Sequence, residues 1–158
     1  MRKVILTLKI TILVGVIAYT GTAVSEDVRY WNISFDILDG TPPEHVSLNF
    51  YTTDTLQSNA ANTFNGYLID YMTLTGFQGQ NAVEGLPPKM FFNKNDNLIT
   101  PQAGIPVDPG GLAYRVKKNG VLYQLFYDGR LRACSQTCYA PMTASPFNVS
   151  NYTFSEIR

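Results

Sequence analysis

Four side chains that carry amide or carboxylate oxygens lie between residues 95 and 108 and could together bind a hard cation. They are Asn95, Asp96, Asn97 and Asp108. Ca²⁺ takes several oxygen ligands of this kind, although the spacing here does not match the loop of an EF-hand. Asn and Asp are also frequent in turns, because their side chains hydrogen-bond to the nearby backbone. We therefore expect a structural loop at residues 95–108 and keep a calcium site as the alternative; no other cofactor is indicated.

The single histidine, His45, is the natural candidate for a general base, but a base must reach a partner that spacing cannot identify. The sequence has neither a Gly-x-Ser-x-Gly nor a His-Glu-x-x-His motif. Two carboxylates could hydrolyse a glycosidic bond only if the fold brings them to one cleft. The available acids are Asp36, Asp70, Glu84 and Asp96. We assign no catalytic residue and keep a secreted hydrolase as an alternative function.

The two cysteines, Cys134 and Cys138, are separated by the polar stretch Ser-Gln-Thr. A redox pair would need a Cys-x-x-Cys motif, and a structural zinc site would need four ligands. Disulfides persist in exported proteins, and a bridge across this spacing requires a turn or loop. The sequence therefore predicts a structural Cys134–Cys138 disulfide within a loop.

Aromatic residues are abundant, with ten Tyr and nine Phe, and most of them fall on predicted core faces. Tyr30 and Tyr51 are different, because each lies on the polar face of a strand with an alternating pattern. Exposed aromatic rings can contact a partner protein or stack on a sugar. We predict Tyr30 and Tyr51 as surface aromatic candidates.

The first 25 residues have the three parts of a signal peptide: basic Arg2 and Lys3, a mostly apolar run from 4 to 16, and small residues at 23–25. We predict a signal-peptide helix at 1–25 and a single domain at 26–158. The alternative is an uncleaved membrane anchor over 4–24. Removal of the signal leaves nine basic and twelve acidic residues, so the domain carries no basic excess and nucleic acid is not an expected partner.

The domain has the pattern of an all-β protein. Apolar and polar residues alternate over 28–37 and again over 46–53, which is typical of half-buried strands. Residues 66–76 have apolar residues on both faces, so we expect that strand to be covered on both sides. Further strands are predicted at 83–86 and 147–157, and a hairpin is predicted at 112–127. We expect an antiparallel β-sandwich or partly closed β-barrel of about seven to nine strands.

Two hairpins can be predicted to the level of register. A two-residue turn at Asn119-Gly120 would place Tyr114 opposite Leu125, with Gln124 on a wet outer face. For the next hairpin a two-residue turn would bury Arg132 against Leu125. A three-residue loop at 128–130 keeps the apolar face consistent, and we predict that loop.

Residues 66–127 resemble a group of bacterial exported proteins of unknown function that often carry a carboxyl-terminal Pro-Glu-Pro sorting signal. The similar features are Gly85-Leu86, the Asn-Asp-Asn-Leu motif at 95–98, Pro101, Asp108 and Gly111-Leu112-Ala113-Tyr114. The resemblance implies an exported or surface β-domain and carries no catalytic residues. The sorting signal itself is absent from the 158 residues, so we do not expect anchoring by that route.

Together these features predict a secreted, periplasmic or extracellular protein without enzymatic activity. It would bind a glycan, a matrix component or a partner protein. Besides the hydrolase, a barrel that carries a small apolar ligand beneath Tyr114 and Leu125 is an alternative. Contact with a membrane is expected only if the N-terminal segment is retained. Asn-x-Ser/Thr sequons occur at Asn32, Asn148 and Asn151.

Overall fold

The computed structural model describes residues 27–39, 43–58, 65–92, 94–101, 104, 106–139, 142 and 144–157. The predicted signal peptide and its cleavage site lie outside the described residues, as does the alternative membrane anchor. Within the described ranges no helix is both long enough and apolar enough to cross a membrane.

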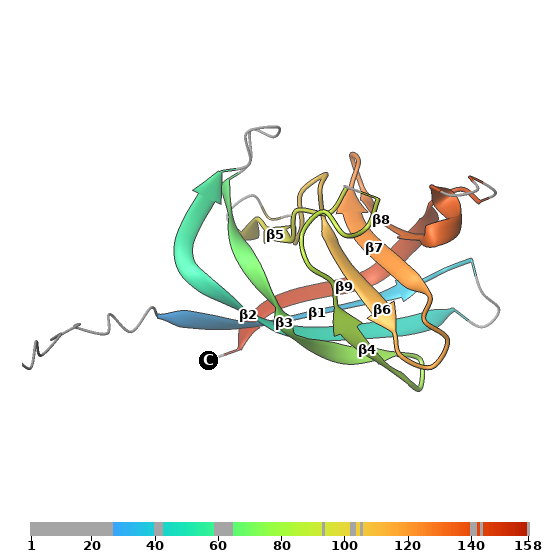
Figure 1. The fold of residues 1–158 in the computed structure, drawn as a ribbon, viewed down its shortest axis with the longest axis horizontal. Coiled ribbons are helices and arrows are strands. Elements are labelled where there is room, and N and C mark those ends of the chain that lie inside the picture. The colour runs from blue at the N-terminus through green and yellow to red at the C-terminus, as the bar shows by residue number, and fades with distance from the viewer. Residues whose placement is uncertain are drawn as a thin grey trace, which may run out of the picture.

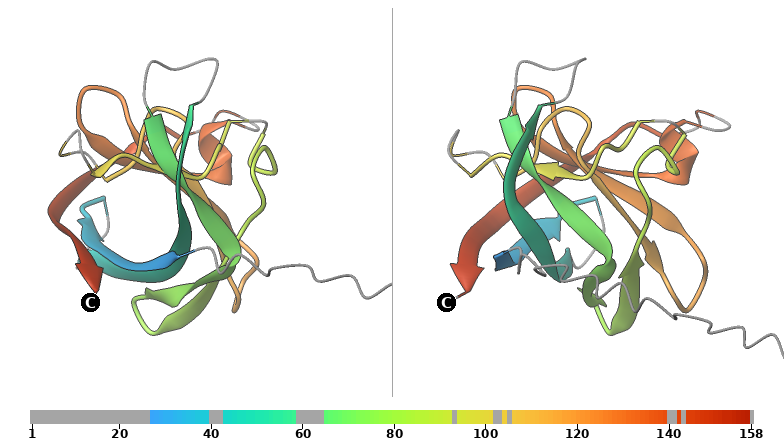
Figure 2. Two further views of the ribbon diagram at one scale, coloured as in Figure 1. Left: turned by 90° about the vertical axis from the view of Figure 1, so that its left-hand side faces the viewer. Right: turned by 60° about the vertical axis from the view of Figure 1, so that its left-hand side comes forward.

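The described chain is all-β, as predicted, and its strands form a closed antiparallel barrel with one additional short strand (Figure 1). The strands are β1 (Val28–Ile37), β2 (Glu44–Ser58), β3 (Asn65–Gln78), β4 (Asn81–Gly85), β5 (Leu98–Ile99), β6 (Leu112–Val116), β7 (Leu122–Tyr127), β8 (Leu131–Ser135) and β9 (Phe147–Ile157). The order around the barrel is β2-β1-β9-β8-β7-β6-β4-β3, and β3 returns to pair with β2. Strand β5 pairs with β3. Both views in Figure 2 show the strands curving around a common interior.

Alternation along the first two strands fills that interior. Trp31, Ile33 and Phe35 of β1 are buried and lie opposite Phe50, Leu48 and Val46 of β2. The intervening polar residues face outward, which confirms the predicted alternation. The Trp31 indole is also paired inside the barrel, because its Nε1 donates to Thr52 Oγ1 at 2.9 Å.

Strand β3 differs from the prediction that it is covered on both sides. Met72 is 74% exposed, whereas Ile69 and Leu74 are both buried. Ile69 and Leu74 are an odd number of residues apart, so a regular strand would place them on opposite faces. The pairing with β2 is irregular between the Asn49–Thr75 and Tyr51–Asp70 pairs. This irregularity turns the side chains of Ile69 and Leu74 to the same, inner face.

The two predicted hairpins have different outcomes. In the β7–β8 hairpin Tyr127 lies opposite Leu131 and Leu125 opposite Ala133, which confirms the three-residue loop at 128–130. In the β6–β7 hairpin Leu112, not Tyr114, lies opposite Leu125, so the predicted register was wrong by two residues. The Val116 N–H donates to the Val121 carbonyl, and the loop therefore spans residues 117–120. An even shift leaves every side chain on its predicted face.

The prediction of a wet outer face on β6 and β7 was wrong. Ala113 and Gln124 are buried beneath a second hydrophobic cluster that contains Leu86 and Phe91. Tyr139, just after the 3₁₀ helix Gln136–Cys138, packs against the same cluster and donates a hydrogen bond to Gln124 Oε1. Residues that precede β6 in the chain and a residue that follows β8 therefore cover this part of the barrel wall together.

Candidate binding face on strands β1, β2 and β9

The amides predicted as calcium ligands form hydrogen bonds inside the fold. Asn95 and Asn97 are buried, and the Asn95 Nδ2 donates to Asn97 Oδ1 at 2.8 Å. Asn95 Oδ1 accepts the Phe91 N–H, and Asn97 Oδ1 also accepts the Ala113 N–H. Asn97 Nδ2 donates to the Leu86 carbonyl at 2.7 Å. These contacts link Leu86, Phe91, Asn95 and Asn97 to β6, and the amide oxygens accept hydrogen bonds from N–H groups.

The two predicted carboxylate ligands also contact the backbone of this region. Asp108 Oδ1 accepts the Gly111 N–H at 2.8 Å, and Asp96 Oδ1 accepts the Leu98 N–H at 3.3 Å. Among the described residues no group of three or more His, Cys, Asp or Glu side chains is arranged to hold a metal. The calcium site stays a prediction, while the contacts present serve the loop that leads into β6.

The remaining predicted pairs and acids are located as follows. The sulfurs of Cys134 and Cys138 are at disulfide distance, with their Cα atoms 6.0 Å apart. Cys134 lies in β8, and Cys138 is the last residue of the 3₁₀ helix. Asp70 Oδ1 accepts the Met72 N–H within β3. Glu84 on β4 forms ion pairs with Arg115 and Lys117. Asp70 and Glu84 therefore belong to separate local networks.

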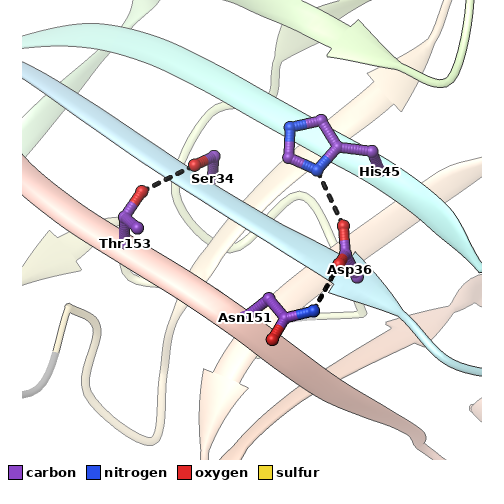
Figure 3. Close-up of polar contacts among 5 residues, drawn as sticks. All are labelled: Ser34, Asp36, His45, Asn151 and Thr153. Carbon is purple, nitrogen blue, oxygen red and sulfur yellow. Dashed lines mark hydrogen bonds and ion pairs between the residues drawn. The ribbon is translucent and has the colours of Figure 1, made fainter.

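On the outside of the barrel Asp36 has polar partners on both neighbouring strands (Figure 3). It lies on β1 between His45 of β2 and Asn151 of β9, and register positions it opposite His45. His45 Nδ1 is 2.7 Å from Asp36 Oδ1, and Asn151 Nδ2 donates to Asp36 Oδ2 at 2.9 Å. These hydrogen bonds, that of Asn151 above all, lower the pKa of the Asp36 carboxyl from its usual value.

Local structure explains why Asn151 reaches Asp36. The pairing of β1 with β9 shifts register between Ser34 and Asp36, so that Ser34 lies opposite Thr153 and Asp36 opposite Ser150. Asn151 lies in this bulge with a φ of 50°, a left-handed conformation that Asn adopts more readily than most residues. On the regular side of the bulge, Ser34 Oγ and Thr153 Oγ1 are 2.6 Å apart.

Polar side chains continue along the same outer face toward the start of β1. Asn32 Nδ2 lies within hydrogen-bonding distance of Asn49 Oδ1, at 3.0 Å, and of Ser47 Oγ, at 3.3 Å. Beyond them Tyr30 of β1 and Tyr51 of β2 lie opposite each other, with ring centroids 4.7 Å apart. Tyr51 is 40% exposed. The two tyrosines predicted separately thus form one aromatic pair at the end of a polar row.

This outer surface of β1, β2 and β9, from the Tyr30–Tyr51 pair to the Asp36 cluster, is called the polar face below. Its carboxylate and hydroxyls can accept hydrogen bonds, and its hydroxyls and amides can donate them. The aromatic pair adds a flat apolar surface with a polar hydroxyl edge. With Nδ1 donating to Asp36, a neutral His45 presents Nε2 as an acceptor. These groups can bind a ligand that both donates and accepts hydrogen bonds and has an apolar ring face.

A pocket of about 690 Å³ lies close to one end of the polar face, around the β9 bulge and the β7–β8 turn. Its lining includes Leu38, which follows β1, together with Tyr152 of the bulge. Tyr127 and Arg130 contribute from the β7–β8 hairpin. The pocket does not lie beneath Tyr114 and Leu125, which belong to the filled core.

The sequence identified Tyr30 and Tyr51 but missed the Asp36 cluster. Asp36 and His45 flank the predicted turn between the first two strands, so a hairpin register could have paired them. No local signal could have brought Asn151 to Asp36, because 115 residues separate them. Comparison of the chain with protein-family models, with curated proteins and with solved structures finds no match.

Proposed function

We propose that this protein is an exported β-barrel domain that binds a carbohydrate chain through the polar face. The observation that carries the proposal is the continuous row of hydrogen-bonding side chains across β1, β2 and β9, which ends at the stacked Tyr30–Tyr51 pair. A sugar ring has hydroxyls that donate and accept hydrogen bonds around a flatter apolar surface. The polar face offers complementary hydrogen-bonding groups along the sheet and an aromatic surface at its end.

The contrast with the opposite wall of the barrel supports a binding role for this face. Buried Gln124 on β7 has its side-chain oxygen occupied by Tyr139 beneath a hydrophobic cluster. On the polar face Asn32, Ser34 and Asp36 stay half-buried, and Tyr51 is exposed. The side chains are already held by mutual hydrogen bonds, which reduces the entropy lost when a ligand binds. The fold therefore keeps this row accessible and ordered.

Two further features support export of the domain. The Cys134–Cys138 sulfurs are at disulfide distance, and disulfides are typical of oxidising compartments. The N-terminal 25 residues have the composition of a signal peptide. Carbohydrate chains of cell walls and matrices are abundant in the same compartments.

Binding should be tested on a glycan array, followed by calorimetric titration of any oligosaccharide that binds. Tyr51→Ala should weaken binding about fivefold or more, because truncating an aromatic anchor commonly costs more than about 1 kcal/mol. Phe92→Ala is the matched control, since Phe92 is similarly exposed, at 43%, but belongs to the 88–92 turn. Equal losses in both variants, or an array without any binding, would contradict the proposal.

A hydrolase is the second candidate function, and the His45–Asp36 pair favours it. A carboxylate on Nδ1 orients an imidazole so that Nε2 can act as a base. Turnover of a polysaccharide that the array identifies, abolished in both His45→Ala and Asp36→Asn, would establish this function. Binding without turnover would leave the protein a carbohydrate-binding domain.

A further inference from the structure

The pocket beside the polar face has a floor that is part of the barrel core. Leu131 of β8 is almost completely buried, and Val149 of β9 packs against the same core cluster. Because the core side chains beneath are buried, including Ile33 and Phe35 at 0% exposure, a ligand can lie on this floor but cannot extend into the barrel. A long alkyl chain would find no tunnel here. The pocket suits a short, flat ligand.

The pocket exists because β9 leaves β8 early. Strands β8 and β9 share only the Arg132–Asn148 and Ala133–Phe147 pairs, whereas β9 stays paired with β1 as far as Ile157. Tyr152, in the β9 bulge, therefore lines one side and is 50% exposed. Tyr127, at the end of β7, also lines the pocket. Two tyrosines offer apolar ring surface with hydroxyl edges.

Arg130 gives the pocket a positive charge that no ion pair among the described residues neutralises. Three other arginines form ion pairs: Arg29 with Asp54, Arg115 with Glu84 and Arg132 with Asp128. Arg130 is exposed in the β7–β8 turn, lines the pocket and has no ion pair within the described ranges. A guanidinium binds a carboxylate through two parallel hydrogen bonds. The pocket thus combines aromatic surface with one available cation.

The pocket and the polar face meet at the β9 bulge. Asn151 donates to Asp36 on the polar face, and its neighbour Tyr152 lines the pocket. Leu38, just after β1, continues the connection, because its N–H donates to the Asn148 carbonyl at 3.0 Å and it also lines the pocket. A chain bound along the polar face would therefore reach the pocket at its end.

We propose that this pocket binds the terminal uronic acid of the glycan, with Arg130 on its carboxylate and Tyr127 and Tyr152 beside its ring. This inference rests on the proposed function, and it adds a substrate class, namely glycans that end in an acidic sugar. The volume of about 690 Å³ lies within the range of small-molecule sites, about 300–1,000 Å³.

The test compares two forms of one oligosaccharide that binds, one ending in a neutral sugar and one in the corresponding uronate. Calorimetric titration of the intact domain should give at least about tenfold tighter binding of the uronate form, as expected for a charge-assisted bidentate contact. Arg130→Gln should reduce affinity for the uronate form to that for the neutral form and leave the latter unchanged. Lys118→Gln, in the loop at 117–120, makes the same change of net charge as a control.

The outcomes separate this inference from the proposed function. Equal binding of the two forms by the unmodified protein would overturn the acidic-sugar inference but leave carbohydrate binding intact. A preference for uronate that survives in Arg130→Gln would also overturn it, because the selectivity would arise elsewhere. Loss of the preference in Tyr152→Ala, with neutral binding retained, would support the pocket. No binding of either form would contradict both proposals.

Discussion

Replacing Asn97 with Asp tests whether the oxygens at 95–108 serve the fold or a cation. The substitution keeps the shape of the side chain but changes Nδ2, which donates to the Leu86 carbonyl, into an oxygen. Asn97 is 1% exposed, so water cannot replace the lost donor. Two acceptors would then face each other at 2.7 Å, and a negative charge would be buried with them. The remaining oxygen could still accept from Asn95 and Ala113.

The expected loss can be worked out from these contacts. A buried carbonyl without its donor costs about 1–3 kcal/mol, and the uncompensated charge brings the total to about 3–5 kcal/mol. That is a large part of a stability of about 5–15 kcal/mol. Burial would also raise the pKa of the new carboxyl above its unfolded value of about 3.9. The destabilisation should therefore be least below pH 4 and grow as pH rises through the folded-state pKa.

Urea unfolding measures this effect, with the fluorescence of the single tryptophan, the buried Trp31, as the signal. Titrations should be run at pH 4 and pH 7, each with millimolar CaCl₂ and with a chelator. Asn119→Asp is the control, because Asn119 is exposed and the new side chain can still accept the Val121 N–H. Its midpoint should hardly move. If Asn97→Asp were as stable as the original protein and gained further stability from calcium, the structural account of these residues would be wrong.

Three further variants test the packing and electrostatics of the barrel. Burial raises the pKa of Tyr114 well above its usual value, so the stability gained from a neutral phenol is complete below about pH 10 and lost as pH rises through the folded-state pKa. Tyr114→Phe should lose about 1–3 kcal/mol at pH 8, because the Gln78 oxygen loses its donor, and should lose less additional stability above pH 10 in urea titrations. Gly111→Ala should cost about 2–4 kcal/mol, since φ is 66° and a Cβ would collide with a β7 carbonyl, whereas Gly120→Ala, with φ of 71° and open space, should cost only about 1 kcal/mol. Asp36→Asn should make the free energy of unfolding depend less on pH between pH 5 and pH 2. The lowered pKa of Asp36 gives stability that is present above about pH 3.9 and lost as pH falls through the folded-state pKa. An unchanged slope in this pH range would contradict that assignment.

Strands β1 and β9 were predictable from their residue patterns, although only β1 has a face that is buried without interruption. Alternation over residues 28–37 and the run 147–157 gave β1 and β9 with the bounds that the structure has. The β7–β8 loop was also predictable, because a three-residue loop kept Arg132 away from Leu125 whereas a two-residue loop did not. Face parity is a strong constraint, since a shift of one residue turns every side chain to the wrong face.

The exact register of a hairpin was not predictable, because a shift by two residues leaves every side chain on the same face. The Asn119-Gly120 pair indicates a type I′ turn, which requires positive φ at both positions. In the structure Gly120 has a φ of 71°, but Asn119 is not in the left-handed region and instead accepts the Val121 N–H through its side chain. Loops of two and four residues place the same side chains in the core. Hydrophobic pattern therefore cannot choose between them, and local hydrogen bonds decide.

The components of the polar face were visible in the sequence, but their assembly was not. Alternation assigned Tyr30 and Tyr51 to outward positions, yet only the β1–β2 register makes them neighbours. Asn151 reaches Asp36 because β9, the last strand, pairs with β1, the first. No local sequence pattern indicates a pairing between strands so far apart in the chain. The Asn-rich segment at 95–97 was conspicuous for its composition. The Asn95 and Asn97 side chains are nevertheless buried, and they hydrogen-bond to the backbone of Phe91, Leu86 and Ala113.

Polar residues at outward positions of this barrel are either buried or accessible, depending on whether another part of the chain covers them. Gln124 and Asn32 are both polar residues on strands of the barrel. Gln124 lies on the face that the cluster of Leu86, Phe91 and Tyr139 covers, whereas Asn32 lies on the half-exposed polar face. A buried amide must have all its partners within the protein, which fixes the covering segment in place. An accessible amide can exchange a protein or water partner for a ligand. This distinction is why binding should be sought on the polar face and not at the loop of residues 95–97.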